Sequence, residues 1–100
     1  MEILKTMLEQ NPEDPFARYG LAMEYANSGQ LENAVAEFRA VLEFNPSYAA
    51  AYFHGGQVLE KLGRVDDARQ IYEKGIEVTA RTGDQHTGSE LQAALDLLPI

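Results

Sequence analysis

Apolar residues recur at intervals of three and four along most of the chain, which is the spacing of an amphipathic helix. Phe16, Tyr19 and Met23 form one such stripe, and Ala68, Tyr72 and Ile76 would form another. The stretches between these stripes are rich in charged and turn-forming residues. The pattern predicts helices at residues 1–10, 15–27, 31–44, 49–62, 65–79 and 85–97.

Helix-ending residues mark the gaps between the predicted helices. Gly29 and Gly63 stand where a residue in the left-handed conformation closes a helix. Pro46 stops the preceding helix, because proline disfavours helical geometry in the residue before it. For the last helix, Asp84 and Ser89 are both candidate N-terminal caps.

Matching residues recur 34 positions apart. The pairs are Pro12 and Pro46, Gly29 and Gly63, Ala34 and Ala68, and Phe38 and Tyr72. A fixed period in this range indicates stacked structural repeats. Two antiparallel helices cannot bury their apolar stripes alone, so neighbouring hairpins must share one continuous core.

The spacing within each period resembles the tetratricopeptide repeat, a helical hairpin of 34 residues with the pattern W-x2-L-G-x2-Y…A-x3-F…P. The first period carries Leu21-Ala22-x2-Tyr25, Gly29, Ala34-x3-Phe38 and Pro46. The second carries Gly56-x2-Leu59, Gly63 and Ala68-x3-Tyr72.

This resemblance implies an all-α fold, a right-handed solenoid of helical hairpins with about six helices in a single domain over residues 1–100. Its expected parts are a partial-repeat helix at 1–14, repeats at 15–48 and 49–82, and a C-terminal capping helix at 83–100.

Some positions depart from the family pattern. Arg18 stands where the family has tryptophan or another large apolar residue, and Tyr52 fills the same position in the second repeat. Gly55 replaces a large aliphatic residue. The pair Gly55-Gly56 therefore predicts a thin spot in the first helix of the second repeat, where a partner's side chain could insert.

Composition and charge exclude several classes of function. With 16 acidic and 8 basic residues, the chain has a formal net charge of −8, whereas binding to a phosphate backbone needs a basic face. No apolar run approaches the roughly 20 residues of a membrane span. The N-terminus lacks the basic region of a signal peptide. We therefore expect a cytoplasmic protein that binds neither nucleic acid nor membranes.

The sequence contains no pattern typical of an enzyme or a metal site. It has no cysteine, no phosphate-binding glycine loop, no nucleophile elbow and no H-E-x-x-H motif. Neither His54 nor His86 has neighbours at the spacing of metal ligands. Asp66-Asp67 matches compensation of a helix dipole better than a catalytic carboxylate pair. The prediction is a non-enzymatic protein without cofactor or metal.

The resemblance further implies that the first helix of each repeat lines a concave groove. Aromatic side chains and methionine among these residues favour an apolar patch, which is typical of binding surfaces. The expected groove residues are Phe16, Tyr19, Met23, Ala26 and Asn27 from the first repeat and Phe53, His54, Gln57, Glu60 and Lys61 from the second.

Some members of the family clamp the acidic tail of a chaperone with lysine, asparagine and arginine. Here Tyr19, Met23 and His54 occupy positions where that clamp needs lysine or asparagine. The resemblance therefore implies a different ligand, and the negative net charge also disfavours an acidic one. We expect a protein or peptide partner whose bound segment is apolar or amphipathic.

Self-association is the alternative to an external partner. Two full repeats make a short solenoid, so its ends or its groove could pair in a symmetric dimer. In that case the protein is a structural unit, and a second copy fills the groove.

Overall fold

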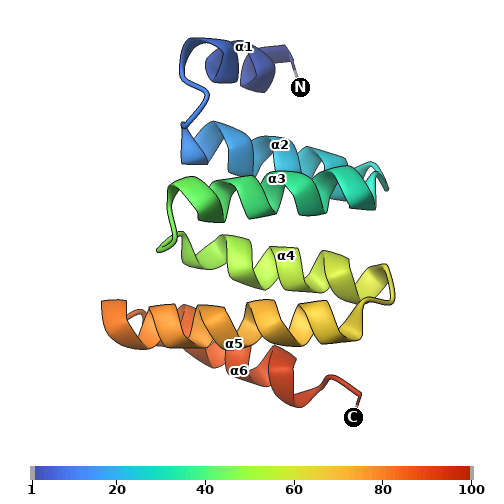
Figure 1. Cartoon of the computed structure of the whole chain (residues 1–100), viewed down its shortest axis with the longest axis vertical. Helices are drawn as coiled ribbons and strands as arrows, with labels where there is room; N and C mark the ends of the chain where they lie inside the picture. Colours follow the sequence, from blue (N-terminus) through green and yellow to red (C-terminus); the bar gives the residue numbers. More distant parts are fainter. Residues whose placement is uncertain (1, 100) are drawn as a thin grey trace.

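The computed structural model describes residues 2–99, and this part of the chain is a stack of α-helices without strands (Figure 1). The expected all-α solenoid of about six helices is confirmed. Its helices are α1 (Glu2–Gln10), α2 (Pro15–Asn27), α3 (Leu31–Phe44), α4 (Ala49–Lys61), α5 (Val65–Thr82) and α6 (Gln85–Asp96).

Helices that follow one another in the sequence also pack side by side. The hairpins α2–α3 and α4–α5 lie one below the other, and α6 packs against both α5 and α4. The first helix, α1, and the last, α6, lie at opposite ends of the stack (Figure 1). The result is an elongated molecule of 40 × 29 × 18 Å.

Capping residues set the helix boundaries. Gly29, Gly63 and Gly83 have φ angles of 80°, 77° and 80°, a left-handed conformation that costs glycine little. Because Gly83 closes α5, this helix continues to Thr82, three residues beyond its predicted end at residue 79. Arg81 and Thr82 do not continue the apolar stripe of α5, so the hydrophobic pattern could not predict this last turn.

The N-terminal cap of α6 is Asp84 rather than Ser89. Its carboxylate accepts a hydrogen bond from the backbone N–H of Thr87 at 3.1 Å. Ser89 lies inside the first turns of the helix. Asp14 caps α2 in the same way, accepting from the N–H of Phe16 at 3.0 Å.

The core is a continuous apolar column between the helices. Ala34 and Ala68 are fully buried, as their matched positions in the two repeats predict. The largest fully buried side chains are Tyr72, Phe38, Leu59, Leu91, Val41 and Val78.

The thin spot predicted at Gly55-Gly56 does not exist, because side chains of the same chain fill it. The Tyr72 ring lies directly against Gly56, where any Cβ would collide with it. A Cβ on Gly55 would lie 3.3 Å from Ile71 and 3.4 Å from Phe38. The glycines thus allow close packing within the chain and leave no space for a partner.

Arg18 and Tyr52 make equivalent contacts, although the two residues differ chemically. The Tyr52 hydroxyl donates to the carbonyl of Pro46 at 2.6 Å, and the Arg18 guanidinium donates to the carbonyl of Pro12 at 2.8 Å. Arg18 also pairs with Glu37 at 3.0 Å. Both side chains therefore tie a helix to the turn before it, which explains why arginine fits this position.

Candidate functional site

Residues of α2, α4 and α6 line two neighbouring hollows on the surface. A hollow of about 230 Å³ lies between α2 and α4, with Phe38 and Val58 among the residues that line it. Both of these side chains are buried, so they form its floor. The remaining lining residues are Met23, Ala26, Asn27, His54, Gln57 and Lys61.

A second hollow of about 410 Å³ lies between α4 and α6. Gln57 borders both hollows, so together they form one continuous surface, which we call the groove. The second hollow is lined by Phe53, Gln57 and Glu60 of α4 and by Glu90, Ala93, Ala94 and Leu97 of α6 and its C-terminal end.

Most of the residues expected in the groove lie there. Met23, Ala26, Asn27, His54, Gln57 and Lys61 line the first hollow, and Phe53, Gln57 and Glu60 line the second.

Phe16 and Tyr19 lie outside both hollows. The Phe16 side chain is 66% exposed on α2. Tyr19 packs inward, with ring centroids 5.9 Å from Phe38 and 5.1 Å from Tyr48. Burial, with a smaller contribution from Tyr48, raises the pKa of the Tyr19 hydroxyl. The half-buried Tyr19 ring therefore packs beside the groove but lines neither hollow.

His54 is an uncharged part of the wall at neutral pH. Its ring lies between Tyr19 and Phe53, with centroid distances of 6.1 and 5.3 Å. Burial lowers the pKa of His54 below its ordinary value of 6.5, and the nearby charge of Glu90 only partly opposes this effect. The imidazole thus adds aromatic surface and a hydrogen-bonding edge, but no positive charge.

Glu60 is held in place from inside the fold. The buried Tyr72 ring fills the space beside Gly56, and its hydroxyl donates a hydrogen bond to the Glu60 carboxylate. Burial and the bond to Glu60 raise the pKa of Tyr72 far above the ordinary value of 10.0. The hydroxyl therefore keeps its proton at physiological pH and fixes the Glu60 carboxylate at the edge of the groove.

Sequence reasoning missed the contribution of α6. Glu90, Ala93, Ala94 and Leu97 form one wall of the larger hollow, yet this helix was expected only to cap the stack. The order of the helices could have predicted this wall, because the first helices of successive repeats stack on one another. A helix that follows the second hairpin must lie in the same layer as α2 and α4.

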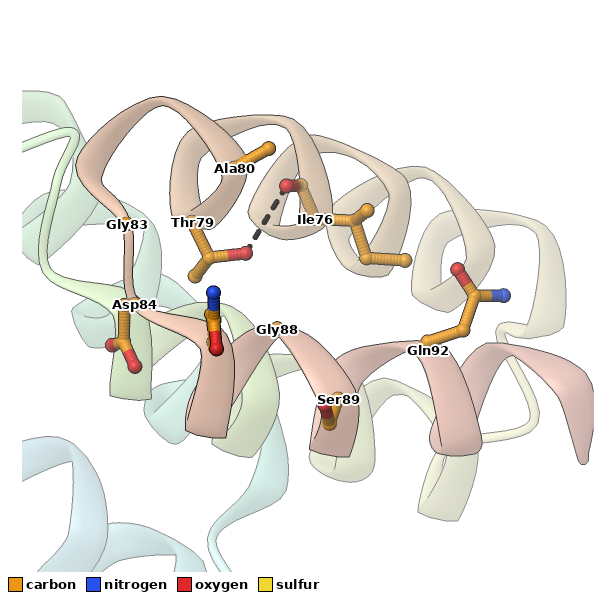
Figure 2. A pocket seen from close by; sticks show the side chains of 9 residues that line it. Ile76, Thr79, Ala80, Gly83, Asp84, Gly88, Ser89 and Gln92 are labelled. Carbon is orange, nitrogen blue, oxygen red and sulfur yellow. Dashed lines mark hydrogen bonds between the residues drawn. The ribbon is translucent and has the colours of Figure 1, made fainter.

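A third hollow, of about 490 Å³, lies between α5 and α6 (Figure 2). Thr79 points toward the backbone of α6 at Gly88, and its hydroxyl donates to the carbonyl of Ile76 at 3.1 Å. The Asp84 carboxylate at its edge already caps α6. The side chains of Thr79 and Asp84 thus serve local structure.

Within residues 2–99, no three or more histidine or acidic side chains gather as a metal site would require. None of the helices in this range combines the length and the apolar character that crossing a membrane requires.

Comparisons with known proteins agree with this architecture. The family model described as tetratricopeptide repeat matches residues 19–84. The chain belongs to the tetratricopeptide repeat family, whose domains generally mediate protein–protein interactions.

The chain resembles bacterial members of this family. A tetratricopeptide repeat domain protein from Salinibacter ruber is 44% identical, with a TM-score of 0.79 over 85% of this chain and 86% of that one. A TPR repeat-containing protein of Pseudomonas aeruginosa is 28% identical, with 95% of this chain and 90% of that protein covered.

A more distant structure shares the fold. The TPR2B domain in the TPR2B-domain:pHsp70 complex of yeast Sti1 is 16% identical, with a TM-score of 0.88 over 94% of this chain and 75% of that one. At this level of identity the likeness concerns the fold alone.

Proposed function

We propose that the protein is a cytoplasmic, non-enzymatic binding module whose groove holds an apolar or amphipathic segment of a partner protein. The observation that supports this proposal is the continuity of the two hollows across α2, α4 and α6, joined at Gln57. The Sti1 domain, which has the same fold, is described in a complex with pHsp70.

The mechanism is burial of apolar anchors on a preformed surface. Met23 and Phe53 offer half-buried apolar side chains, and Leu97 is 84% exposed at the end of the groove. Polar groups between them, such as Asn27 and Gln57, would orient the bound segment. Because helices carry all of these residues except Leu97, the groove loses little backbone entropy on binding.

The test compares two variants that carry the same chemical change on opposite faces. Gln57→Arg places a bulky side chain between the two hollows, and both residues have similar helix propensity. Gln70→Arg makes the same change on α5, beside a different hollow that Arg39 and Leu42 line. Circular dichroism first establishes that both variants fold like the wild type.

Capture from a lysate of the source organism is then read by mass spectrometry. A partner held by wild type and by Gln70→Arg, but lost with Gln57→Arg, supports the groove as the binding surface. Equal capture by all three proteins contradicts it.

Sedimentation distinguishes self-association from the binding of another protein. A protein that captures only its own copies and sediments as a dimer would be a structural unit whose groove is filled by a second chain. A monomer at all concentrations removes this alternative.

A further inference from the structure

The charges in the groove are distributed unevenly along it. In the described chain, the hollow between α4 and α6 is bordered by two carboxylates, Glu60 and Glu90, and by no lysine or arginine. The charged residue in the hollow between α2 and α4 is Lys61. One end of the groove is thus acidic, while the other is weakly basic.

Neither carboxylate at the acidic end is neutralised by a permanent cation. Glu60 accepts a hydrogen bond from Tyr72, which is an uncharged donor. Glu90 lies 3.1 Å from His86, whose side chain is 88% exposed. A contact as exposed as this one contributes little and is easily exchanged for a better partner.

The walls beside these carboxylates are apolar. Phe53 from one side and Ala93, Ala94 and Leu97 from the other line the same hollow of about 410 Å³. A site with apolar walls and an acidic rim matches lysine or arginine, whose aliphatic stem covers apolar surface while the charged end stays at the rim. The face of an aromatic ring such as Phe53 also attracts a cation.

We infer that the groove selects a cationic amphipathic segment, which places a lysine or arginine in the hollow between α4 and α6 and an apolar face along the groove. This inference rests on the proposed function and names the chemistry of the partner. Charge complementarity carries it: Glu60 and Glu90 attract the cation, and the net charge of −8 steers a basic segment toward the protein. An acidic segment would meet repulsion at the same place.

The test uses three fluorescent helical peptides that share one leucine face and differ only in the flanking residues, which are lysine, glutamine or glutamate. Anisotropy titrations measure Kd at low and at physiological ionic strength. We expect the lysine peptide to bind wild type about tenfold more tightly than the glutamate peptide, with the difference shrinking as salt is added.

Two variants with an equal change in net charge distinguish attraction at the hollow from the long-range attraction of the whole protein's negative charge. Glu90→Lys reverses one carboxylate at the hollow, and Glu73→Lys makes the same change at an exposed position on α5. We expect Glu90→Lys to weaken the lysine peptide about tenfold and to favour the glutamate peptide, whereas Glu73→Lys has less than about a twofold effect. Glu60→Gln, which keeps an acceptor for Tyr72, should weaken the lysine peptide to an intermediate degree.

Three results would overturn the inference. Equal affinity for all three peptides, with loss of each in Gln57→Arg, would support a binding groove but not cation selection. If Glu90→Lys and Glu73→Lys weakened binding of the lysine peptide equally, the overall negative charge of the protein would explain its preference, and not the hollow between α4 and α6. Absence of binding by any peptide would reject the cationic segment, while the capture experiment still decides the proposed function separately.

Discussion

The ring of Tyr72 on α5 occupies the space that a side chain at Gly56 on α4 would need. This contact brings the two helices of the second hairpin close together. It also lets the Tyr72 hydroxyl reach the Glu60 carboxylate at the edge of the groove. One glycine in the core thus determines the position of a charged group on the proposed binding surface.

We expect Gly56→Ala to destabilise the protein by about 1–3 kcal/mol, because its Cβ would overpack against the Tyr72 ring. The loss outweighs the usual gain of roughly 1 kcal/mol when alanine replaces glycine in a helix. Urea unfolding followed by circular dichroism measures the difference.

Gly55→Ala is the matched control for this substitution. Its Cβ would meet the flexible end of Ile71 at 3.3 Å, and Ile71 is only half-buried, so it can yield. We expect a free energy of unfolding within about 0.5 kcal/mol of wild type. An equal loss of stability in Gly55→Ala and Gly56→Ala would show that the clash with Tyr72 is not the cause of the destabilisation.

The small residues at the helix contacts should not tolerate enlargement. Ala34 and Ala68 are fully buried, so leucine at either position should lower the free energy of unfolding by about 1–3 kcal/mol. Ala36→Leu, at an exposed position of α3, is the control and should have little effect. Unchanged thermal midpoints for the buried pair would contradict this packing of the repeats.

The Tyr52 hydroxyl should contribute measurably to stability. Tyr52→Phe keeps the buried ring but removes the donor to the Pro46 carbonyl, which lies 2.6 Å away. We expect a loss of about 0.5–1.5 kcal/mol in chemical denaturation. A value near zero would mean that the carbonyl is equally well satisfied by water.

Asp84 should stabilise α6 only while its carboxylate is ionised. The backbone N–H of Thr87 holds the pKa of Asp84 below its ordinary value of 3.8. A carboxyl with a lowered folded pKa adds stability above its unfolded pKa, and this stability is lost as the pH falls through the folded pKa. Asp84→Ala should therefore lower the thermal midpoint at neutral pH, and its difference from wild type should shrink below pH 3.8.

Asp84→Asn is the control, because asparagine caps a helix about as well as aspartate but does not titrate in this range. Thermal melts of the three proteins between neutral and acidic pH measure the effect. A constant difference between Asp84→Ala and wild type at every pH would exclude the ionised cap as its cause.

The repeat period predicted most of the architecture. Helix-closing glycines such as Gly29 and Gly63 are local features that depend on backbone conformation alone, so their spacing predicted the hairpins. The fully buried Ala34 and Ala68 follow from the same register. Local sequence rules are sufficient for these features because each hairpin contacts only its neighbours.

Contacts between helices were less predictable. The bulk of Tyr72 compensates for Gly56, and this complementarity joins residues on two different helices. Tyr19 likewise lies on the apolar stripe of α2, but its ring packs on Phe38 and Tyr48 and lines neither hollow of the groove. A stripe on one helix identifies an apolar face, whereas the neighbouring side chains decide which members of it stay accessible.

The central claim is that the surface across α2, α4 and α6 receives the partner. The most direct measurement is a chemical-shift map of ¹⁵N-labelled protein titrated with the segment of a captured partner. We predict the largest shifts at Ala26, His54, Gln57 and Ala94, with little change at Gln70 on α5. Shifts concentrated around Gln70, or at the two ends of the stack, would contradict the claim.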